Sequence, residues 1–388
     1  MSTKHSKAAA EFLKNKKQAA WHDETLWLVR AKRDRLSKEV PEWEELRNMA
    51  CATKLYSNSH LDELLVEFEN NARANGAHVY WAKDADEYCN IVYNILNQHG
   101  VKHFIKSKSM LAEECELNPF LESKGIEVVE SDLGERILQL MHLKPSHIVL
   151  PAIHIKREQV GELFEREMGT EKGNFDPTYL THAARKNLRQ KFIHAEAAMT
   201  GANFAVASTG EIVVCTNEGN ADMGTSQPKL QIAAFGMEKI VPDRESLGVF
   251  TRLLARSATG QPITTYTSHY RKPREGGELH IIIVDNGRSK ILADPKHIKT
   301  LNCIRCGACM NTCPVYRRSG GYSYTYFIPG PIGINLGMLK APLHYYDNVS
   351  ACSLCYSCSF VCPAKVDLAE QIYLWRQDLD FRRVLFRS

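Results

Sequence analysis

The C-terminal part of the chain reads Cys303-Ile-Arg-Cys306-Gly-Ala-Cys309-Met-Asn-Thr-Cys313-Pro314 and, further on, Cys352-Ser-Leu-Cys355-Tyr-Ser-Cys358-Ser-Phe-Val-Cys362-Pro363. Both runs have the form C-x2-C-x2-C-x3-C-P, the spacing of a module that holds two [4Fe–4S] clusters. Three closely spaced thiolates suit three corners of a cubane cluster, and the fourth thiolate, after a longer step, suits the other cluster. The spacing therefore predicts one cluster on Cys303, Cys306, Cys309 and Cys362, and a second on Cys352, Cys355, Cys358 and Cys313.

Structural zinc is the main alternative for so many cysteines. Zinc sites need only four thiolates, usually as two C-x-x-C pairs roughly 15–20 residues apart. Here eight cysteines come in two runs of identical spacing, each closed by a proline. Neither zinc nor a disulfide framework accounts for the third cysteine of each run, so the pattern favours iron–sulfur clusters.

The overall composition is that of a globular protein. The chain has 388 residues, 44% of them hydrophobic and 24% charged, which is enough for two or three domains. No apolar run reaches the ~18 residues of a membrane-spanning helix, and the N-terminal segment lacks the apolar stretch of a signal peptide. The cysteines outside the two runs are scattered and are expected to be free thiols, which favours a reducing cytoplasm: Cys51, Cys89, Cys115 and Cys215.

The positive charge of the chain is local. The formal net charge is only +4, so nothing marks a nucleic-acid surface. Residues 1–40 hold ten Lys or Arg and five Asp or Glu, a net +5, and contain helix formers without Gly or Pro. Residues 1–54 are therefore expected to form a basic helical arm. A solvated helix and an arm that docks on a partner subunit or on an anionic membrane face both remain open.

Residues 55–290 alternate between helical and extended patterns. Helices separated from one another by short apolar strands are typical of βαβ units and a largely parallel sheet. Thr209-Gly210 suggests a two-residue hairpin in a β-rich centre. The expected strands are 78–82, 102–106, 126–130, 147–151, 204–208, 211–215, 230–234 and 280–285, and the expected helices are 61–74, 84–99, 113–123, 176–192 and 243–257.

The cysteine runs belong to a separate domain, expected at residues 295–380 after a boundary near 286–298. The 38 residues from Pro314 to Ala351 are a longer connection than a compact bacterial ferredoxin uses. We therefore expect an α-helical ferredoxin domain in which each run leads into a helix, the second over residues 366–381. Residues 381–388 do not continue any pattern and are expected to be an atypical, truncated tail.

Polar residues gather where the predicted strands end, as at Lys106-Ser-Lys-Ser-Met110, Ser131-Asp-Leu-Gly-Glu135 and Thr216-Asn-Glu-Gly-Asn220. Strand ends of an open α/β sheet are where ligands bind, and such residues can hold an anion. The same residue types also fill ordinary turns, so this alternative stays open. No glycine-rich nucleotide motif is present.

The chain resembles a known family. The runs from Lys106 to Leu140, from Pro145 to His154 and from Ala195 to Met223, followed by FGMEKIVP, resemble the LUD domain of lactate-utilisation proteins. Joined to the two cysteine runs, they resemble the lactate utilisation protein B family. The resemblance implies a fold of the NagB/RpiA/CoA transferase type. It also implies two partners, which are a cysteine-rich subunit similar to glycolate oxidase iron–sulfur proteins and a small LUD protein.

The function that this resemblance implies is electron transfer in the oxidation of L-lactate to pyruvate. If the central domain binds lactate, a carboxylate could accept the proton of the lactate hydroxyl group. The candidates for contact with substrate are Glu196, Thr209, Asn217 and Glu218. Arg305, between two cluster ligands, either raises the potential of its cluster or is a screened surface residue. Two other functions remain open: a CoA-transferase-like or isomerase-like enzyme, and a redox-sensing binding module.

Overall fold

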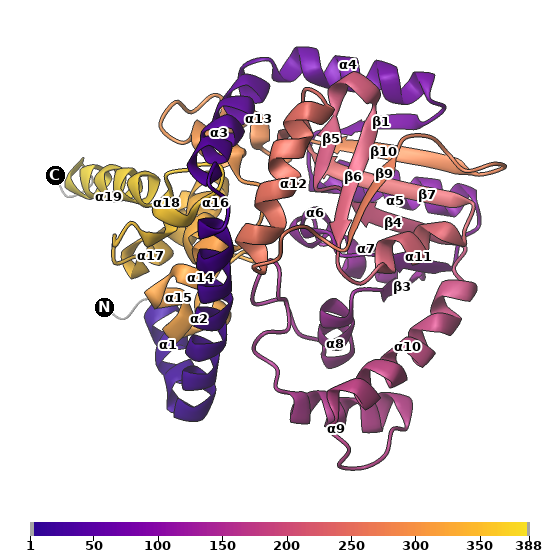
Figure 1. The fold of residues 1–388 in the computed structure, drawn as a ribbon, viewed down its shortest axis with the longest axis horizontal. Coiled ribbons are helices and arrows are strands. Elements are labelled where there is room, and N and C mark those ends of the chain that lie inside the picture. Colours follow the sequence, from indigo (N-terminus) through magenta and orange to yellow (C-terminus); the bar gives the residue numbers. More distant parts are fainter. Residues whose placement is uncertain (1–3, 386–388) are drawn as a thin grey trace.

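The computed structural model describes residues 4–385, with side chains up to residue 379. An α/β domain lies beside a group of short helices, and the first three helices run along that group (Figure 1). The larger sheet has six strands, all paired in parallel. Their spatial order is β1 (His78–Ala82), β10 (Glu278–Val284), β7 (Leu230–Gly236), β4 (Ala197–Gly201), β2 (His103–Lys106) and β3 (Glu127–Glu130). The expected α/β fold with a parallel sheet is confirmed.

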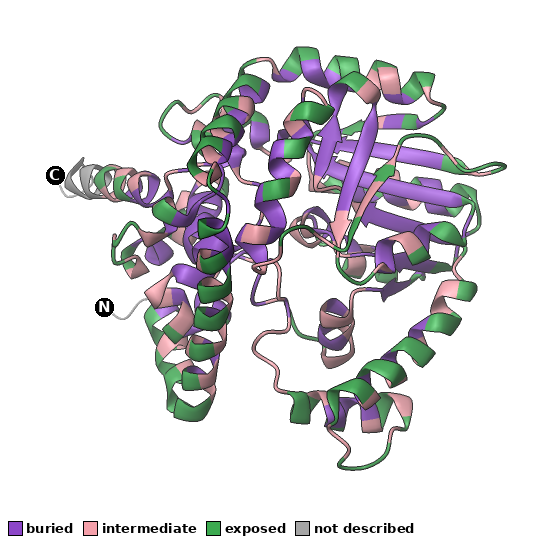
Figure 2. Cartoon of the chain, in the orientation of Figure 1, coloured by how far each residue is buried: buried purple, intermediate pink, exposed green. Residues whose placement is uncertain are grey.

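Apolar residues cover both faces of the large sheet, and its central strands are almost wholly buried (Figure 2). Alternate residues of β10 take part in different cores, because successive side chains of a strand point to opposite faces. Ile281 packs in one core with Phe68, and Ile282 packs in another with Val92. The helices of this domain are α4 (Leu61–Ala74), α5 (Ala85–Gln98), α6 (Met110–Glu114), α7 (Leu117–Ser123), α8 (Leu133–Met141), α9 (Arg157–Met168), α10 (Pro177–Ile193), α11 (Asn220–Ser226) and α12 (Arg244–Ala258).

A smaller sheet packs beside the large one. Its spatial order is β8 (Ile240–Val241), β5 (Phe204–Val206), β6 (Glu211–Thr216) and β9 (Tyr266–Tyr270), with β5 and β6 antiparallel. The hairpin between β5 and β6 is longer than predicted. Val206 pairs with Glu211, so four residues form the turn, and three of them make a 3-10 turn before Gly210. Gly210 has φ +66° and lies against the backbone of α4, where a Cβ atom would not fit.

The C-terminal domain consists of helices and loops, and no strand occurs among the described residues after β10. Short helices follow the cysteines of both runs, and longer helices connect and close the domain. They are α13 (Arg288–Leu292), α14 (Ala308–Thr312), α15 (Pro314–Ser319), α16 (Gly330–Lys340), α17 (Pro342–Ala351), α18 (Ser357–Val361) and α19 (Leu368–Leu385). This arrangement confirms the expected α-helical ferredoxin type.

The basic N-terminal segment is not a free arm. It forms α1 (Lys4–Lys14), α2 (Lys16–Lys38) and α3 (Trp43–Ser59). Arg33 of α2 is buried and donates a hydrogen bond to the carbonyl of Val361 at 3.0 Å, and Arg47 of α3 donates to the carbonyl of Cys362 at 3.1 Å. The arginines therefore satisfy carbonyl groups at the end of the second cysteine run, which the solvated-arm interpretation missed.

The predicted strand at residues 147–151 is wrong. This segment is a turn organised by the buried imidazole of His147, whose Nδ1 accepts hydrogen bonds from the N–H groups of Val149 and Leu150 at 3.0 Å. The Nε2 atom of His147 lies 2.9 Å from Oδ1 of Asn311 in α14. The apolar side chains of the segment pack between domains, and this packing accounts for a pattern that resembles a buried strand.

Other differences have local causes. The predicted helix 113–123 is split into α6 and α7 at Glu116, which has φ +54°, because Pro119 cannot continue a helix through the preceding turn. Strand β4, Ala-Ala-Met-Thr-Gly, was not predicted because three of its five residues are Ala or Gly, which have low strand propensity. No helix among the described residues combines the length and apolar character needed to cross a membrane. The side chains of the predicted tail, residues 381–388, lie outside the described part of the structure.

Candidate metal centres and the adjoining pocket

Four cysteines line one cavity of the helical domain. Cys303, Cys306 and Cys309 come from the first run, and Cys362 comes from the end of the second. Burial and the neighbouring thiols raise the pKa of Cys309 well above its usual value. Four thiolates in one cavity, three of them buried, would repel one another strongly without a cation between them. The cavity therefore suits a metal group that binds thiolates.

The other four cysteines make a second set. Burial raises the pKa of Cys313 to about 11, and the thiols of Cys352 and Cys355 add to this effect. The pKa of Cys358 is also raised, first by burial and then by Cys313. Cys313 thus lies near the second run although it belongs to the first. Cys355 is the one exposed cysteine among those of the described chain, which places this set nearer to solvent.

The two cysteine loops have matching backbone conformations. Arg305 and Leu354, each two residues after the first cysteine of a run, have φ +60° and +52°. Such values are uncommon for residues other than glycine. They let the N–H groups of Arg305 and Leu354 approach Sγ of Cys303 and Cys352 at 3.4 and 3.3 Å. Hydrogen bonds to ligating sulfurs are one of the factors that set the potential of a cluster.

The fourth cysteine of each run also accepts a hydrogen bond from a backbone N–H group. The N–H group of Tyr316 donates to Sγ of Cys313 at 3.5 Å, and the N–H group of Val366 donates to Sγ of Cys362 at 3.3 Å. The repeated loops, the N–H donors and the two converging sets of four sulfurs fit a pair of [4Fe–4S] clusters. A single tetrahedral zinc ion would use only four of the eight sulfurs.

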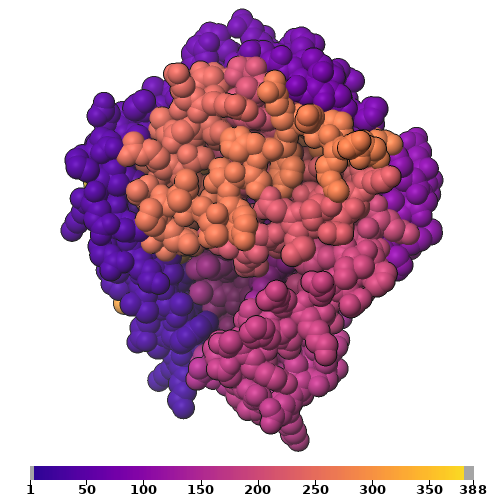
Figure 3. All heavy atoms as spheres, turned by 45° about the vertical axis from the view of Figure 1, so that its right-hand side comes forward, coloured from indigo at the N-terminus to yellow at the C-terminus, as the bar shows by residue number. Residues whose placement is uncertain are grey.

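A pocket of about 300 Å³ lies where strands β2, β4 and β7 end at the carboxyl edge of the large sheet. This is the edge at which α/β proteins bind ligands. Figure 3 shows the surface hollowed between the orange part of the chain and the magenta part. Arg305 of the first cysteine loop lines the pocket, and Ile148 lines both the pocket and the cavity of the first cysteine set. The pocket and the first set therefore share a wall.

A charge network forms this wall. Glu238, 2% exposed, pairs with Arg288, and it also pairs with Arg305 at 3.5 Å. Arg288 pairs in addition with Glu114 at 2.9 Å. Burial alone would raise the pKa of Glu238, but the guanidinium groups outweigh it and lower the pKa to about 2. Lys54, buried in α3, donates a hydrogen bond to the carbonyl of Glu238.

The pocket has an acidic part as well. Asp132 caps α8 by accepting from the N–H groups of Gly134 and Glu135, and Glu218 accepts from the N–H group of Leu133 at 3.3 Å. Burial in the pocket wall and the nearby carboxylate of Asp132 raise the pKa of Glu218 to about 7. Lys108 lies close enough to oppose this rise. Glu218 can therefore exchange a proton near neutral pH.

The structure separates the four residues predicted for substrate contact. Asn217 and Glu218 line the pocket. Glu196 lies at the amino end of β4, where its carboxylate accepts from the N–H groups of Lys102 and His103 at 2.5 and 2.8 Å. Thr209 lies in the β5–β6 turn, and its carbonyl accepts from the side chain of Asn75, the residue after α4, at 2.8 Å. Glu196 and Thr209 line no part of the pocket.

Sequence reasoning missed the basic residues of the pocket that follow β7 and β10. Lys239 and Arg288 both line the pocket. Their signal is a charged residue directly after a buried strand, as in FGMEK and IIIVDNGR. The same signal is present in the runs Lys106-Ser-Lys-Ser-Met110 and Thr216-Asn-Glu-Gly-Asn220. Four residues of the first run do line the pocket: Ser107, Lys108, Ser109 and Met110.

The pKa of Glu218 gives a testable prediction about stability. A carboxyl group with a pKa of about 7 in the folded chain and about 4.5 in the unfolded chain takes up a proton on folding between these pH values. Its contribution to stability therefore falls as pH rises from about 4.5 to 7. We expect Glu218→Gln to raise the melting temperature relative to wild type by an increment that grows over this range and levels off above pH 8.

Glu196→Gln is the matched control. Hydrogen bonds from the N–H groups of His103 and Lys102 lower the pKa of Glu196, so the effect of this substitution should not change between pH 6 and 8. Thermal denaturation at pH 5, 6, 7 and 8 measures both variants. An increment for Glu218→Gln that is the same at every pH would contradict the raised pKa.

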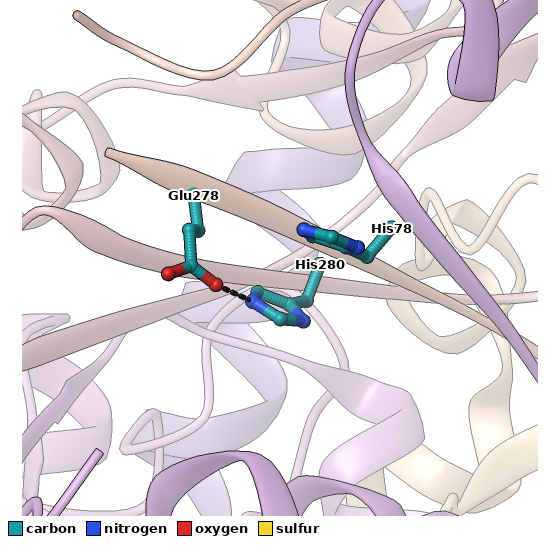
Figure 4. Close-up of side chains that lie close together, drawn as sticks. All are labelled: His78, Glu278 and His280. Carbon is teal, nitrogen blue, oxygen red and sulfur yellow. Dashed lines mark hydrogen bonds and ion pairs between the residues drawn. The ribbon is translucent and has the colours of Figure 1, made fainter. Parts of the chain in front are cut away.

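A second group of possible metal ligands lies at the amino edge of the large sheet, away from the pocket. His78 begins β1, while Glu278 and His280 lie on β10, with ligand atoms within 4.8 Å of one another (Figure 4). The two imidazole rings stack with centroids 4.8 Å apart and an angle of 24° between planes. His280 bonds to Tyr80 at 3.0 Å and to Glu278 at 2.9 Å, so both ring nitrogens have protein partners. Hydrogen bonding and stacking account for this group.

The fold and the two cysteine sets define an iron–sulfur protein in which an α/β domain is joined to a helical domain of the ferredoxin type. The chain belongs to the LUD domain family, whose model matches residues 65–291. The model of the 4Fe-4S dicluster domain matches residues 299–366. The protein is therefore a [4Fe–4S] protein, with two clusters as its cofactors.

Curated relatives share both parts of the chain. Lactate utilization protein B of Geobacillus thermodenitrificans is 44% identical over 348 residues, which cover 88% of this chain and 73% of that protein. The uncharacterized electron transport protein YkgF of Escherichia coli is 41% identical over 356 residues, covering 90% and 74%. A solved DUF162 family protein from Deinococcus radiodurans has 15% identity and a TM-score of 0.34, covering 58% of this chain and 98% of that chain.

Proposed function

We propose that this chain is the iron–sulfur electron-transfer subunit of a complex that oxidises L-lactate to pyruvate. The observation that carries the proposal is the pair of four-cysteine sites next to an α/β pocket, in a chain 44% identical to lactate utilization protein B. The reaction removes two electrons and two protons from lactate. Each [4Fe–4S] cluster, when bound, accepts one electron at a time, so two clusters suit a two-electron donor.

Two sets of four cysteines hold the two clusters. Cys303, Cys306, Cys309 and Cys362 hold the cluster beside the pocket. Cys352, Cys355, Cys358 and Cys313 hold the other, with Cys355 at the surface. The positive charge of Arg305, bonded through its N–H group to Cys303, favours the reduced state of the first cluster.

Partner subunits complete the proposal. An electron acceptor must approach the more exposed cysteine set, and helices α17 and α18, which adjoin these cysteines in the chain, expose large apolar side chains. Phe360 is 75% exposed and Leu343 is 85% exposed, which is unusual for apolar residues unless they bind another surface. We assign this face to a cysteine-rich iron–sulfur subunit, with a small LUD protein as the third member. We propose that the complex is cytoplasmic, because free thiols persist in that compartment.

Reconstitution tests the proposal. Anaerobically prepared protein should contain about eight irons per chain. In the presence of the two partners, L-lactate should reduce the clusters, seen as bleaching in the visible spectrum and as an EPR signal, and one pyruvate should form for every two electrons. A strain that lacks this chain should not grow on L-lactate. Iron-replete complex that L-lactate leaves oxidised would contradict the function.

One observation keeps a second function open. Glu218 lines the pocket and could serve as the glutamate of a CoA-transferase-like enzyme, whereas Glu196 lies outside the pocket. Acyl-CoA exchange by the purified protein that is lost in Glu218→Ala and kept in Glu196→Ala would support that activity. Absence of exchange in protein with full iron content would exclude the CoA-transferase-like activity.

A further inference from the structure

The part of the pocket beside the first cysteine loop has one cation more than it has carboxylates. Glu238 and Glu114 are matched by Arg288 and Arg305. Lys239 also lines the pocket, directly after Glu238, and its ammonium group has no hydrogen bond or ion pair among the described residues. This charged group is therefore available to a ligand.

Two further polar groups point to the same conclusion. The side chain of Arg305 is nine-tenths buried, yet its Nη1 atom has no hydrogen-bond partner. Ser107, 4% exposed, lines the pocket at the end of β2, and its Oγ atom also has no partner. Buried donors of this kind are costly unless something bonds to them. The unpartnered Nη1 atom of the guanidinium and the unpartnered hydroxyl indicate a ligand that accepts hydrogen bonds.

The basic and acidic parts of the pocket lie apart. Lys239 follows β7, whereas Asp132 follows β3, and strands β4 and β2 lie between them. With strands about 4.8 Å apart, the two parts are separated by roughly 14 Å at the backbone. A small anion at Lys239 and Arg305 can therefore avoid the repulsion of Asp132 and Glu218.

We propose that Lys239, Arg305 and Ser107 form the binding site for a small carboxylate of the hydroxy-acid or oxo-acid class. The cations bind the carboxylate group, and Ser107 donates to a carboxylate or carbonyl oxygen. Only the identity of the acid rests on the proposed function. Because Arg305 belongs to the first cysteine loop, where its backbone N–H group donates to Sγ of Cys303, an anion bound to its side chain cancels part of the positive charge beside the first cluster. Binding should therefore disfavour the reduced state of that cluster.

Calorimetry on the full chain with both clusters tests the site. L-lactate, pyruvate and glycerol are titrated, glycerol being the uncharged control. We expect at least one of the two acids to bind, and glycerol not to bind. Lys239→Gln should weaken the binding at least tenfold, while Lys239→Arg should keep most of it. Lys186→Gln, on the exposed surface of α10, should bind as wild type does.

The potential of the first cluster gives a second readout. Saturating carboxylate should move its midpoint potential to a more negative value in wild type and in Lys186→Gln, but much less in Lys239→Gln. If neither acid binds to protein with full iron content, the inference is wrong, because Lys239 then only balances the charge of the cluster. If pyruvate binds and L-lactate does not, the site stands and the proposed substrate falls. If the complex oxidises L-lactate although this chain binds no acid, the proposed function stands and the carboxylate site is wrong.

Discussion

Replacing Cys313 by alanine should remove the cluster of the second cysteine run and leave that of the first. Cys313 lies in the first run, but its thiol interacts with those of Cys352 and Cys355. The cavity of the first set is lined instead by Cys362. Loss of one of its four ligands should prevent a [4Fe–4S] cluster from assembling, so the iron content should fall from about eight to about four per chain.

The comparison of three variants makes this prediction specific. Cys313→Ala and Cys358→Ala should lose the same cluster and leave the same EPR signal in the reduced protein. Cys309→Ala should leave the other signal. Cys51→Ala, outside both runs, should keep about eight irons. If Cys313→Ala and Cys309→Ala leave identical signals, each run holds its own cluster and the crossed ligand set is wrong.

The cysteine spacing made the helical domain the most predictable part of the chain. The geometry of the ligands constrains the loops. The cysteine spacing therefore predicts the structure of the loops almost independently of the rest of the chain. The matching φ values of Arg305 and Leu354 show this constraint, because two unrelated residues adopt the same unfavourable conformation. The packing of α2 and α3 on these loops was not predictable, since it depends on arginines meeting carbonyls more than 300 residues away.

The pocket was only partly predictable, for a related reason. Ser107, Lys108 and Glu218 follow strands, and strand ends of a parallel sheet meet at one edge. The contribution of Arg305 comes from the other domain, and no local pattern shows that the first cysteine loop closes the pocket. Thr209 and Glu196 looked similar in sequence but lie elsewhere, since Thr209 is in a turn of the smaller sheet and Glu196 is at the amino end of its strand.

The polar residues just before the pocket form a buried ion pair. Lys106 at the end of β2 is 0% exposed, Glu130 at the end of β3 is 2% exposed, and the two charged groups are 2.7 Å apart. Asn118 of α7 donates a further hydrogen bond to Glu130 at 2.6 Å. The pair joins the carboxyl ends of two neighbouring strands, directly before Ser107 and Ser131. It therefore holds one side of the pocket in place.

Lys106→Met should destabilise the protein by about 3–5 kcal/mol, because it leaves a buried carboxylate without its cation. Lys106→Met combined with Glu130→Leu should recover most of the stability, because the second change removes the unpaired charge. Denaturation of anaerobically prepared protein, followed by circular dichroism at one pH, compares the wild type with the single and the double variant.

A surface pair between α10 and strand β3 provides the comparison. Lys191 and Glu127 are 2.6 Å apart, but their side chains are 37% and 44% exposed. Lys191→Met should cost less than about 1 kcal/mol, because water already solvates both charges. If Lys106→Met costs no more than Lys191→Met, the buried charge is not what makes the inner pair important. If the double variant is as unstable as Lys106→Met, the loss comes from packing around residue 106, and the electrostatic explanation fails.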